Sequence, residues 1–293
     1  MICLRPFRPH RAFSLKHSAV VWAVLGVAVA GCSRKSEKPL ENTKAHVAFL
    51  QKAVSADVAE VRAGLPEGAK HLTGLFEKDA RPSEDLPAVR DALEKARGKV
   101  QDLRVAKSTF FALVDPKGQV LRNDQEQDLM AGKNIFASFP KLKQALAGKY
   151  VETSGAMPEA AGVKGADGQW VAAHPISVGG KIPGLYVTGW SWSSYAYRLE
   201  NSLRSELRGA LSSEHDKLPL VYVYVVVADA AYGAPVSPQV NATAILEQKP
   251  LTKLKDGVFA TTLEITDRQF TLAVGKTDAL GPDVGVAVLR SET

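Results

Sequence analysis

Aromatic residues concentrate in one part of the chain. Trp170, Trp190 and Trp192, three of the four tryptophans, fall within 23 residues, and Tyr150 precedes them. At alternating positions of an expected strand, Trp190 and Trp192 would share one face. Aromatic walls with a few polar groups are the usual make-up of a small-molecule site, and the face of a tryptophan ring also attracts cations. The sequence therefore predicts an aromatic-walled pocket, with core packing of the same rings as the alternative.

Polar anchors for such a ligand are available in the same region. Arg122 and Asp124 follow a short strand pattern, and His174 comes four residues after Trp170. A guanidinium pairs with carboxylates, and a carboxylate pairs with amines. We therefore expect Arg122, Asp124 and His174 to bind an acid or an amine.

Motifs that carry catalysis are missing from the sequence. It has no Gly-x-Ser-x-Gly, no Gly-x-x-x-x-Gly-Lys, no His-Glu-x-x-His and no Cys-x-x-Cys. We expect no enzyme activity, no cofactor and no metal. A hydrolase is the alternative, and it would need His174 within hydrogen-bond reach of a nucleophile and an acid.

The N-terminus has the pattern of an export signal. Residues 1–17 contain four lysine or arginine side chains and no acidic one, an apolar run covers 19–30, and Val29, Ala30 and Gly31 precede Cys32. The run is too short to span a bilayer. Val-Ala-Gly-Cys resembles the lipobox of bacterial lipoproteins, which implies cleavage before Cys32 and a membrane anchor through lipid on its thiol. In that family Ser33 implies the outer membrane, facing the periplasm. An ordinary signal peptide or a short anchor is the alternative.

Removal of residues 1–31 changes the charge and the thiol content. The whole chain has 37 basic and 31 acidic residues, and four basic residues leave with the signal, so the remainder has 33 basic and 31 acidic residues. This near balance gives no support to a nucleic-acid partner, and we expect none. Cys3 also leaves, and Cys32 takes the lipid, so no thiol is left for a disulfide or for catalysis.

A charged, flexible tether is predicted at 32–42, followed by an N-terminal helical region at 43–107. The first helix is predicted to end at Pro66 and Gly68, and the second to begin near Leu86, with Pro87 in its first turn. Apolar residues at three- and four-residue steps define the stripe of the first helix: Val47, Leu50, Val54, Val58, Val61 and Leu65. Such stripes pack on their own domain or form a coiled coil with a second chain, and we expect the former.

From residue 108 the pattern changes to strands. Runs at 109–114 and 119–122 flank Asp115-Pro116-Lys117-Gly118, which predicts a tight hairpin. Short helices are expected over 129–146, and strands at 150–153, 170–176 and 185–192. A connecting helix at 194–218 then leads into an apolar strand at 220–228.

The second half of the chain echoes the first. The turn that begins at Asp115 has a counterpart that begins at Asp229, and the strands at 170–176 and 185–190 have counterparts that begin at Phe270 and Gly285. The echo predicts two copies of one module, at 108–193 and 219–293. A chance match of generic strands is the alternative.

The first module resembles extracytoplasmic sensor domains of the Cache type, which are related to PAS domains. The resemblance is carried by Leu113-Val-Asp-Pro-Lys-Gly-Gln-Val-Leu121, by Gly132-Lys-Asn-Ile-Phe136 and by Leu146-Ala-Gly-Lys149. It implies an α+β fold in which a long N-terminal helix packs behind a five-stranded antiparallel sheet, with ligands between the sheet and the short helices. Such modules usually precede a membrane helix and a signalling domain. Neither follows here, so we expect action through a protein partner.

These patterns predict N-terminal helices followed by two Cache/PAS-like modules. The leading functional hypothesis is a lipid-anchored sensor that binds a small molecule and acts through a protein partner. A non-catalytic structural or interaction lipoprotein of the cell envelope is the alternative, and it would show a filled module core and an exposed apolar patch, for example on the stripe from Leu199 to Leu211.

Overall fold

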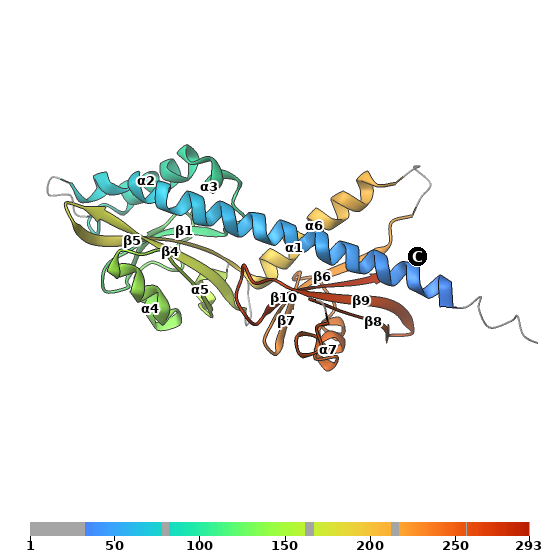
Figure 1. The fold of residues 1–293 in the computed structure, drawn as a ribbon. Helices are drawn as coiled ribbons and strands as arrows, with labels where there is room; N and C mark the ends of the chain where they lie inside the picture. Colours follow the sequence, from blue (N-terminus) through green and yellow to red (C-terminus); the bar gives the residue numbers. More distant parts are fainter. Residues whose placement is uncertain (1–32, 78–81, 162–166, 212–216, 256, 293) are drawn as a thin grey trace, which may run out of the picture.

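The computed structural model describes residues 33–77, 82–161, 167–211, 217–255 and 257–292. It consists of a long N-terminal helix that lies along two five-stranded antiparallel sheets (Figure 1). The predicted α+β class is confirmed, with N-terminal helices followed by two modules that each have an antiparallel sheet and packed helices. None of the helices in the described ranges is both long and apolar enough to cross a membrane.

The N-terminal region contains four helical segments: α1 (Ser33–Lys70), the short 3-10 helix η1 (Thr73–Phe76), α2 (Leu86–Lys99) and α3 (Gln101–Val105). The apolar stripe of α1 is fully buried against its own chain, as predicted. Val100, in an extended conformation, separates α2 from α3.

Helix α1 is longer at both ends than the sequence predicts. It continues through Pro66 to Lys70, although proline costs a helix about 3 kcal/mol. Buried Leu65, Ala69 and Leu72 pack in the core on either side of the proline, and this tertiary packing outweighs the lost hydrogen bond. At the other end, the predicted tether is also wrong within the described part, because residues 33–42 form the beginning of α1. Cys32 itself lies outside the described residues.

The first sheet has the strand order β2-β1-β5-β4-β3. Its strands are β1 (Phe110–Val114), β2 (Val120–Asn123), β3 (Val151–Gly155), β4 (Gln169–Val178) and β5 (Lys181–Ser191). The predicted hairpin turn is present: the carboxylate of Asp115 accepts hydrogen bonds from the backbone N–H groups of Lys117 and Gln119, and Gly118 adopts a φ of 88°. Three short helices, α4 (Ile135–Ser138), η2 (Pro140–Ala147) and α5 (Pro158–Ala161), cover the sheet face opposite α1.

The second sheet has the order β7-β6-β10-β9-β8, which is the order of the first sheet when strands are counted within each module. Its strands are β6 (Leu220–Val227), β7 (Ala230–Gly233), β8 (Val258–Ile265), β9 (Arg268–Lys276) and β10 (Val284–Ser291). Helices α7 (Gln239–Glu247) and η3 (Pro250–Thr252) precede β8. The shared order confirms that the sequence echo reflects two copies of one module.

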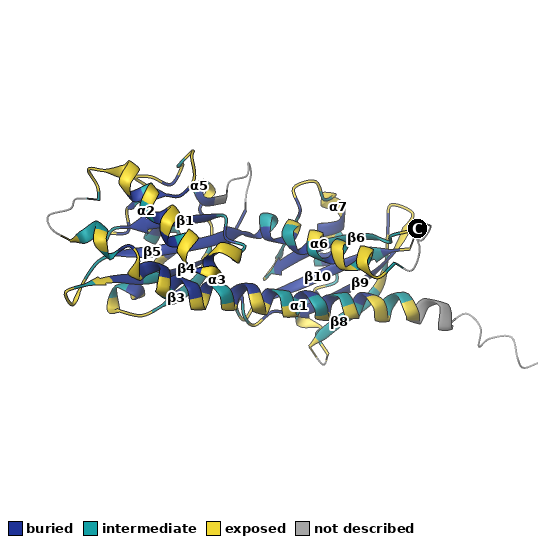
Figure 2. Cartoon of the chain, turned by 90° about the horizontal axis from the view of Figure 1, so that it is seen from above, coloured by how far each residue is buried: buried dark blue, intermediate teal, exposed yellow. Residues whose placement is uncertain are grey.

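Helix α6 (Trp192–Gly209) connects the modules in place of the predicted helix at 194–218. Its Leu199 and Leu203 are buried against β6, so the stripe that the alternative of an interaction lipoprotein would expose lies largely in the core. One apolar cluster runs from the first sheet to the second between the sheets, α1 and α6, and buried residues accordingly follow the strands of both sheets (Figure 2).

Candidate functional site

The three predicted tryptophans lie in the core behind the first sheet. Trp170 stacks on Trp190 with ring centroids 4.3 Å apart, and Trp190 stacks on Tyr195 at 4.7 Å. All of these rings are at most 1% exposed and belong to the cluster that packs against α1 and α6. Trp192 begins α6, so it does not share a strand face with Trp190. The structure thus packs these rings in the core, as the alternative interpretation has it, and none of them lines the two pockets described for this structure.

Asp124 is a structural group of the first module. Its buried carboxylate accepts hydrogen bonds from the backbone N–H of Phe111 at 2.9 Å and from the side chain of Gln125 at 3.0 Å, and it pairs with Arg97 of α2 at 3.1 Å. These bonds fix the end of β2 to β1 and to α2.

The other three predicted residues are dispersed. Arg122 forms an ion pair with Asp128 at 3.1 Å and lines a hollow beside α2. The hydroxyl of Tyr150 donates to Glu152, which also pairs with Arg62 of α1. His174 lies 2.8 Å through Nδ1 from the carbonyl of Pro175, and burial lowers its pKa. The hydrogen-bond partner of His174 is thus a backbone carbonyl, and no hydroxyl or carboxylate is hydrogen-bonded to it within the described ranges.

A pocket of about 460 Å³ opens on the sheet face opposite α1, between the β1–β2 edge and α5. Its position between the sheet and the short helices is the one that the family resemblance implies. None of the seven predicted ligand residues lines it. The lining residues are Thr109, Phe110, Asn123, Gln125, Glu126, Gln127, Leu129, Met130, Pro158, Glu159 and Ala160.

The wall of this pocket is formed by the loop after β2, which Asp128 holds in place. Its carboxylate accepts hydrogen bonds from the backbone N–H groups of Asn123, Met130 and Ala131 at 2.7, 2.9 and 3.0 Å. Gln169 of β4 accepts a hydrogen bond from the N–H of Met157, which positions the start of α5. The pocket is thus bordered by an ordered loop and a fixed helix start.

The pocket is polar and acidic at its mouth and apolar at its floor. Glu126 and Glu159 bring carboxylates, and three amide side chains accompany them, whereas no lysine or arginine belongs to the lining set. Lys133 pairs with Glu159 from the rim at 3.4 Å. The floor is the apolar cluster of Phe110, Met130 and Ala160. With Glu159 paired to Lys133, the carboxylate of Glu126 gives the lining a negative charge that favours a cation over an anion. Sequence reasoning missed these residues, although the polar run at 123–127 was a signal for them.

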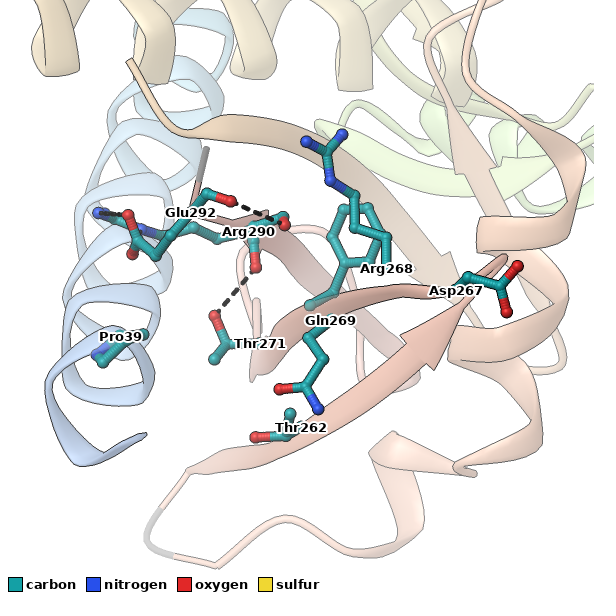
Figure 3. A pocket seen from close by; sticks show the side chains of 10 residues that line it. Pro39, Thr262, Asp267, Arg268, Gln269, Thr271, Arg290 and Glu292 are labelled. Carbon is teal, nitrogen blue, oxygen red and sulfur yellow. Dashed lines mark hydrogen bonds and ion pairs between the residues drawn. The ribbon is translucent and has the colours of Figure 1, made fainter. Parts of the chain in front are cut away.

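A second hollow, of about 490 Å³, lies near the beginning of α1, between α1, the middle of β8, the start of β9 and the end of β10 (Figure 3). Arg290, one of the lining residues, is already paired: its guanidinium contacts Glu292 at 2.9 Å and His46 of α1 at 3.3 Å. No group of three or more His, Cys, Asp or Glu side chains suited to a metal occurs in the part of the chain that the structure describes.

His46 provides a pH-dependent contribution to stability. Burial, and next the positive charge of Arg290, lower the pKa of His46 from 6.5 to about 4. The unfolded chain therefore binds more protons than the folded chain between these values, and stability falls as the pH drops from about 6.5 toward 4. Because His46 is partly solvated, we expect an effect of about 1 kcal/mol between pH 7 and pH 5. Urea unfolding at both pH values should show a smaller loss in His46→Gln than in the wild type, and identical losses would contradict this assignment.

The comparisons with known proteins show the fold. No protein-family model and no curated protein matches the sequence. Among solved structures, an extracellular domain ascribed to a histidine kinase has a TM-score of 0.57 at 10% identity, covering 89% of this chain and 93% of that one. A domain ascribed to a sensory box/GGDEF family protein from Vibrio parahaemolyticus has a TM-score of 0.55 at 10% identity, with 88% and 97% covered. An extracellular ligand-binding receptor from Desulfohalobium retbaense reaches 0.51 at 13% identity, with 85% of this chain and 40% of that chain covered.

Proposed function

We propose that this chain is a non-catalytic extracytoplasmic sensor that binds a small molecule in the pocket between the first sheet and α5. The observation that carries the proposal is the position of this pocket, on the covered face of the first module, in a chain with the two-module fold of sensor domains. The binding residues proposed are those of the loop after β2 and of α5, in place of the tryptophans.

The proposed ligand is a neutral polar or cationic molecule. Glu126 and Glu159 would pair with an amine, the amides of Asn123 and Gln125 would bind hydroxyl or amide groups, and Phe110 with Met130 would contact an apolar part. A simple carboxylate would meet the negative charge of Glu126, and the cation at the rim, Lys133, is already paired with Glu159. The proposal therefore drops the expectation that Arg122 binds an acid, because Arg122 is paired with Asp128.

The proposed anchor is lipid on Cys32 in the outer membrane, with the chain facing the periplasm. Because α1 begins at Ser33, the second module would lie next to the membrane. The 38 residues of α1 span about 57 Å, so the pocket of the first module would lie far from the lipid. Helix α1 contacts both modules and would transmit a change between them to a protein partner.

A thermal-shift screen of residues 33–293 tests this proposal. A ligand at about 100 times its Kd adds about 2.7 kcal/mol, which raises the melting temperature by several degrees. We expect amines or neutral polar compounds to act, and Glu126→Lys, at an exposed position, to weaken an amine about tenfold. Glu247→Lys on α7 makes the same charge change in the other module and should have no effect. Stabilisation by carboxylates alone would contradict the proposed ligand class.

The second candidate function is an interaction lipoprotein of the envelope. It is favoured by the apolar cluster of buried side chains that packs between the first sheet and its short helices. If no class of small molecule stabilises the protein, this candidate replaces the sensor.

A further inference from the structure

The outer edge of β8 is the longest sheet edge of the described structure. The strand order leaves β2, β3, β7 and β8 at the margins, with four, five, four and eight residues respectively. The edge of β2 is partly covered, because Val120 exchanges backbone hydrogen bonds with Gly132 and Lys133. Natural proteins usually shorten or cover such edges, since an open edge is a template for another strand.

The β8–β9 turn defines which backbone groups of β8 face outward. Thr266 and Asp267 have φ values of 50° and 59°, as a two-residue type I′ turn requires. Ile265 and Arg268 are then a hydrogen-bonded pair, and the bonding to β9 recurs at every second residue. Ala260, Thr262 and Glu264 are the residues between, which are not hydrogen-bonded to β9, so their N–H and C=O groups point away from the sheet.

These outward groups have no backbone partners among the described residues. The hydroxyl of Thr261 lies 3.5 Å from the carbonyl of Thr262, and this is a weak contact. Val258, two residues before Ala260, is already paired, because its backbone exchanges two hydrogen bonds of 3.0 and 3.3 Å with the backbone of Lys255. The free edge therefore spans residues 260–264, and Thr262 at its centre stands on the outer strand (Figure 3).

The side chains and charges of β8 specify the strand that would fit. On the face toward α7, Phe259 and Leu263 are only partly buried, and apolar side chains of an added strand would bury them further. Lys253 and Lys255 flank the start of β8, and Glu264 and Asp267 flank its end. An antiparallel strand with a basic N-terminal end and an acidic C-terminal end would therefore pair opposite charges at both ends.

A second copy of the chain is a poor occupant if the chain is anchored as proposed above. Thr43 of α1 contacts Thr271 of β9, and Gln51, further along α1, donates a hydrogen bond to the carbonyl of Lys276 at the end of β9. Strand β9 therefore runs in the same direction as α1, and the antiparallel β8 runs toward the beginning of α1. Two β8 strands paired antiparallel would direct the beginnings of the two α1 helices in opposite directions. Both Cys32 residues could not then reach the same membrane surface.

We propose that the β8 edge binds an extended segment of a partner protein, which adds to the second sheet as an antiparallel strand opposite Ala260, Thr262 and Glu264. The segment has apolar side chains on the α7 face, a basic N-terminal end and an acidic C-terminal end. This recognition is strand addition, in which backbone hydrogen bonds give affinity and side chains give selectivity. It is separate from the small-molecule pocket and uses the proposed anchor only to exclude a second copy.

The experiment measures fluorescence anisotropy of a labelled peptide with the sequence of residues 253–267, which has the required order of charges. With the protein comprising residues 33–293, which contains both sheets, we expect saturable binding. Thr262→Pro removes an outward donor and should weaken binding about tenfold or more. Thr262→Val keeps the donor and should bind as the wild type does. Circular dichroism verifies folding, since edge strands tolerate proline.

A variant-independent test uses the same peptide methylated on alternate backbone nitrogens. Methylation at the counterparts of Ala260, Thr262 and Glu264 should abolish binding, and methylation at the intervening positions should not. Absent or unsaturable binding, or equal binding by Thr262→Pro and Thr262→Val, would overturn the proposal. A peptide with its charged ends exchanged that binds equally well would overturn the stated charge order. Self-association in sedimentation that Thr262→Pro abolishes would assign the edge to a second copy instead. None of these results depends on a ligand in the first module.

Discussion

Replacing Trp190 with alanine lowers the free energy of unfolding by about 3–5 kcal/mol, the range for removing a large aromatic side chain from a well-packed core. Trp190 is fully buried between Trp170 and Tyr195, so the substitution removes the middle ring of the stack and leaves a cavity beside α1 and α6. Chemical unfolding followed by circular dichroism measures the loss.

The matched control for Trp190→Ala is Tyr197→Ala. Tyr197 lies on α6, two residues after Tyr195, but is 49% exposed. Its removal should change stability by less than about 0.5 kcal/mol. A loss below about 1 kcal/mol in Trp190→Ala would contradict the core assignment. If the protein stayed as stable as the wild type but lost binding of a small molecule, the original interpretation of Trp190 as a pocket wall would be restored.

Asp124→Ala is expected to cost about 2–4 kcal/mol. It leaves the buried N–H of Phe111 without its acceptor and Arg97 without its carboxylate, and both losses carry desolvation penalties. The value lies below that of a fully buried ion pair because Arg97 is 36% exposed at its side chain. Urea unfolding, with circular dichroism as the signal, gives the difference in free energy.

Two further variants make the Asp124 result specific. Asp124→Asn keeps an oxygen for the N–H of Phe111 and should lose less than Asp124→Ala. Arg90→Ala disrupts the exposed pair of Arg90 with Glu94 on α2 and should cost about 0.5 kcal/mol or less. A stable Asp124→Ala protein that no longer binds an amine would show instead that Asp124 is a ligand anchor.

The distinction between core and pocket residues also guides ligand studies. A variant of Trp190 or Asp124 would reduce any thermal shift by destabilising the protein, whichever residues bind the ligand. Glu126 is exposed, and none of the described hydrogen bonds or ion pairs uses its side chain, so its substitution reports on the pocket with little effect on folding.

Local patterns in the sequence determined the elements and the module repeat. The apolar stripe of α1, the Asp115 turn, most of the strands and the echo between the two halves all depend on residues close together in the chain. Their period and turn chemistry are therefore visible without a structure. The extension of α1 through Pro66 was not visible, because packing around Leu65 and Ala69 decides it.

Only the tertiary structure decided which face of the first sheet carries the site. Alternation along β4 and β5 separates two sets of side chains, but it does not say which set meets α1 and which meets the short helices. Trp170 and Trp190 fall on the α1 face, where a long helix excludes solvent, and Asp124 meets Arg97 across 27 residues of sequence. The pocket forms instead where the loop after β2 approaches α5, two segments that lie close together only once the sheet has formed.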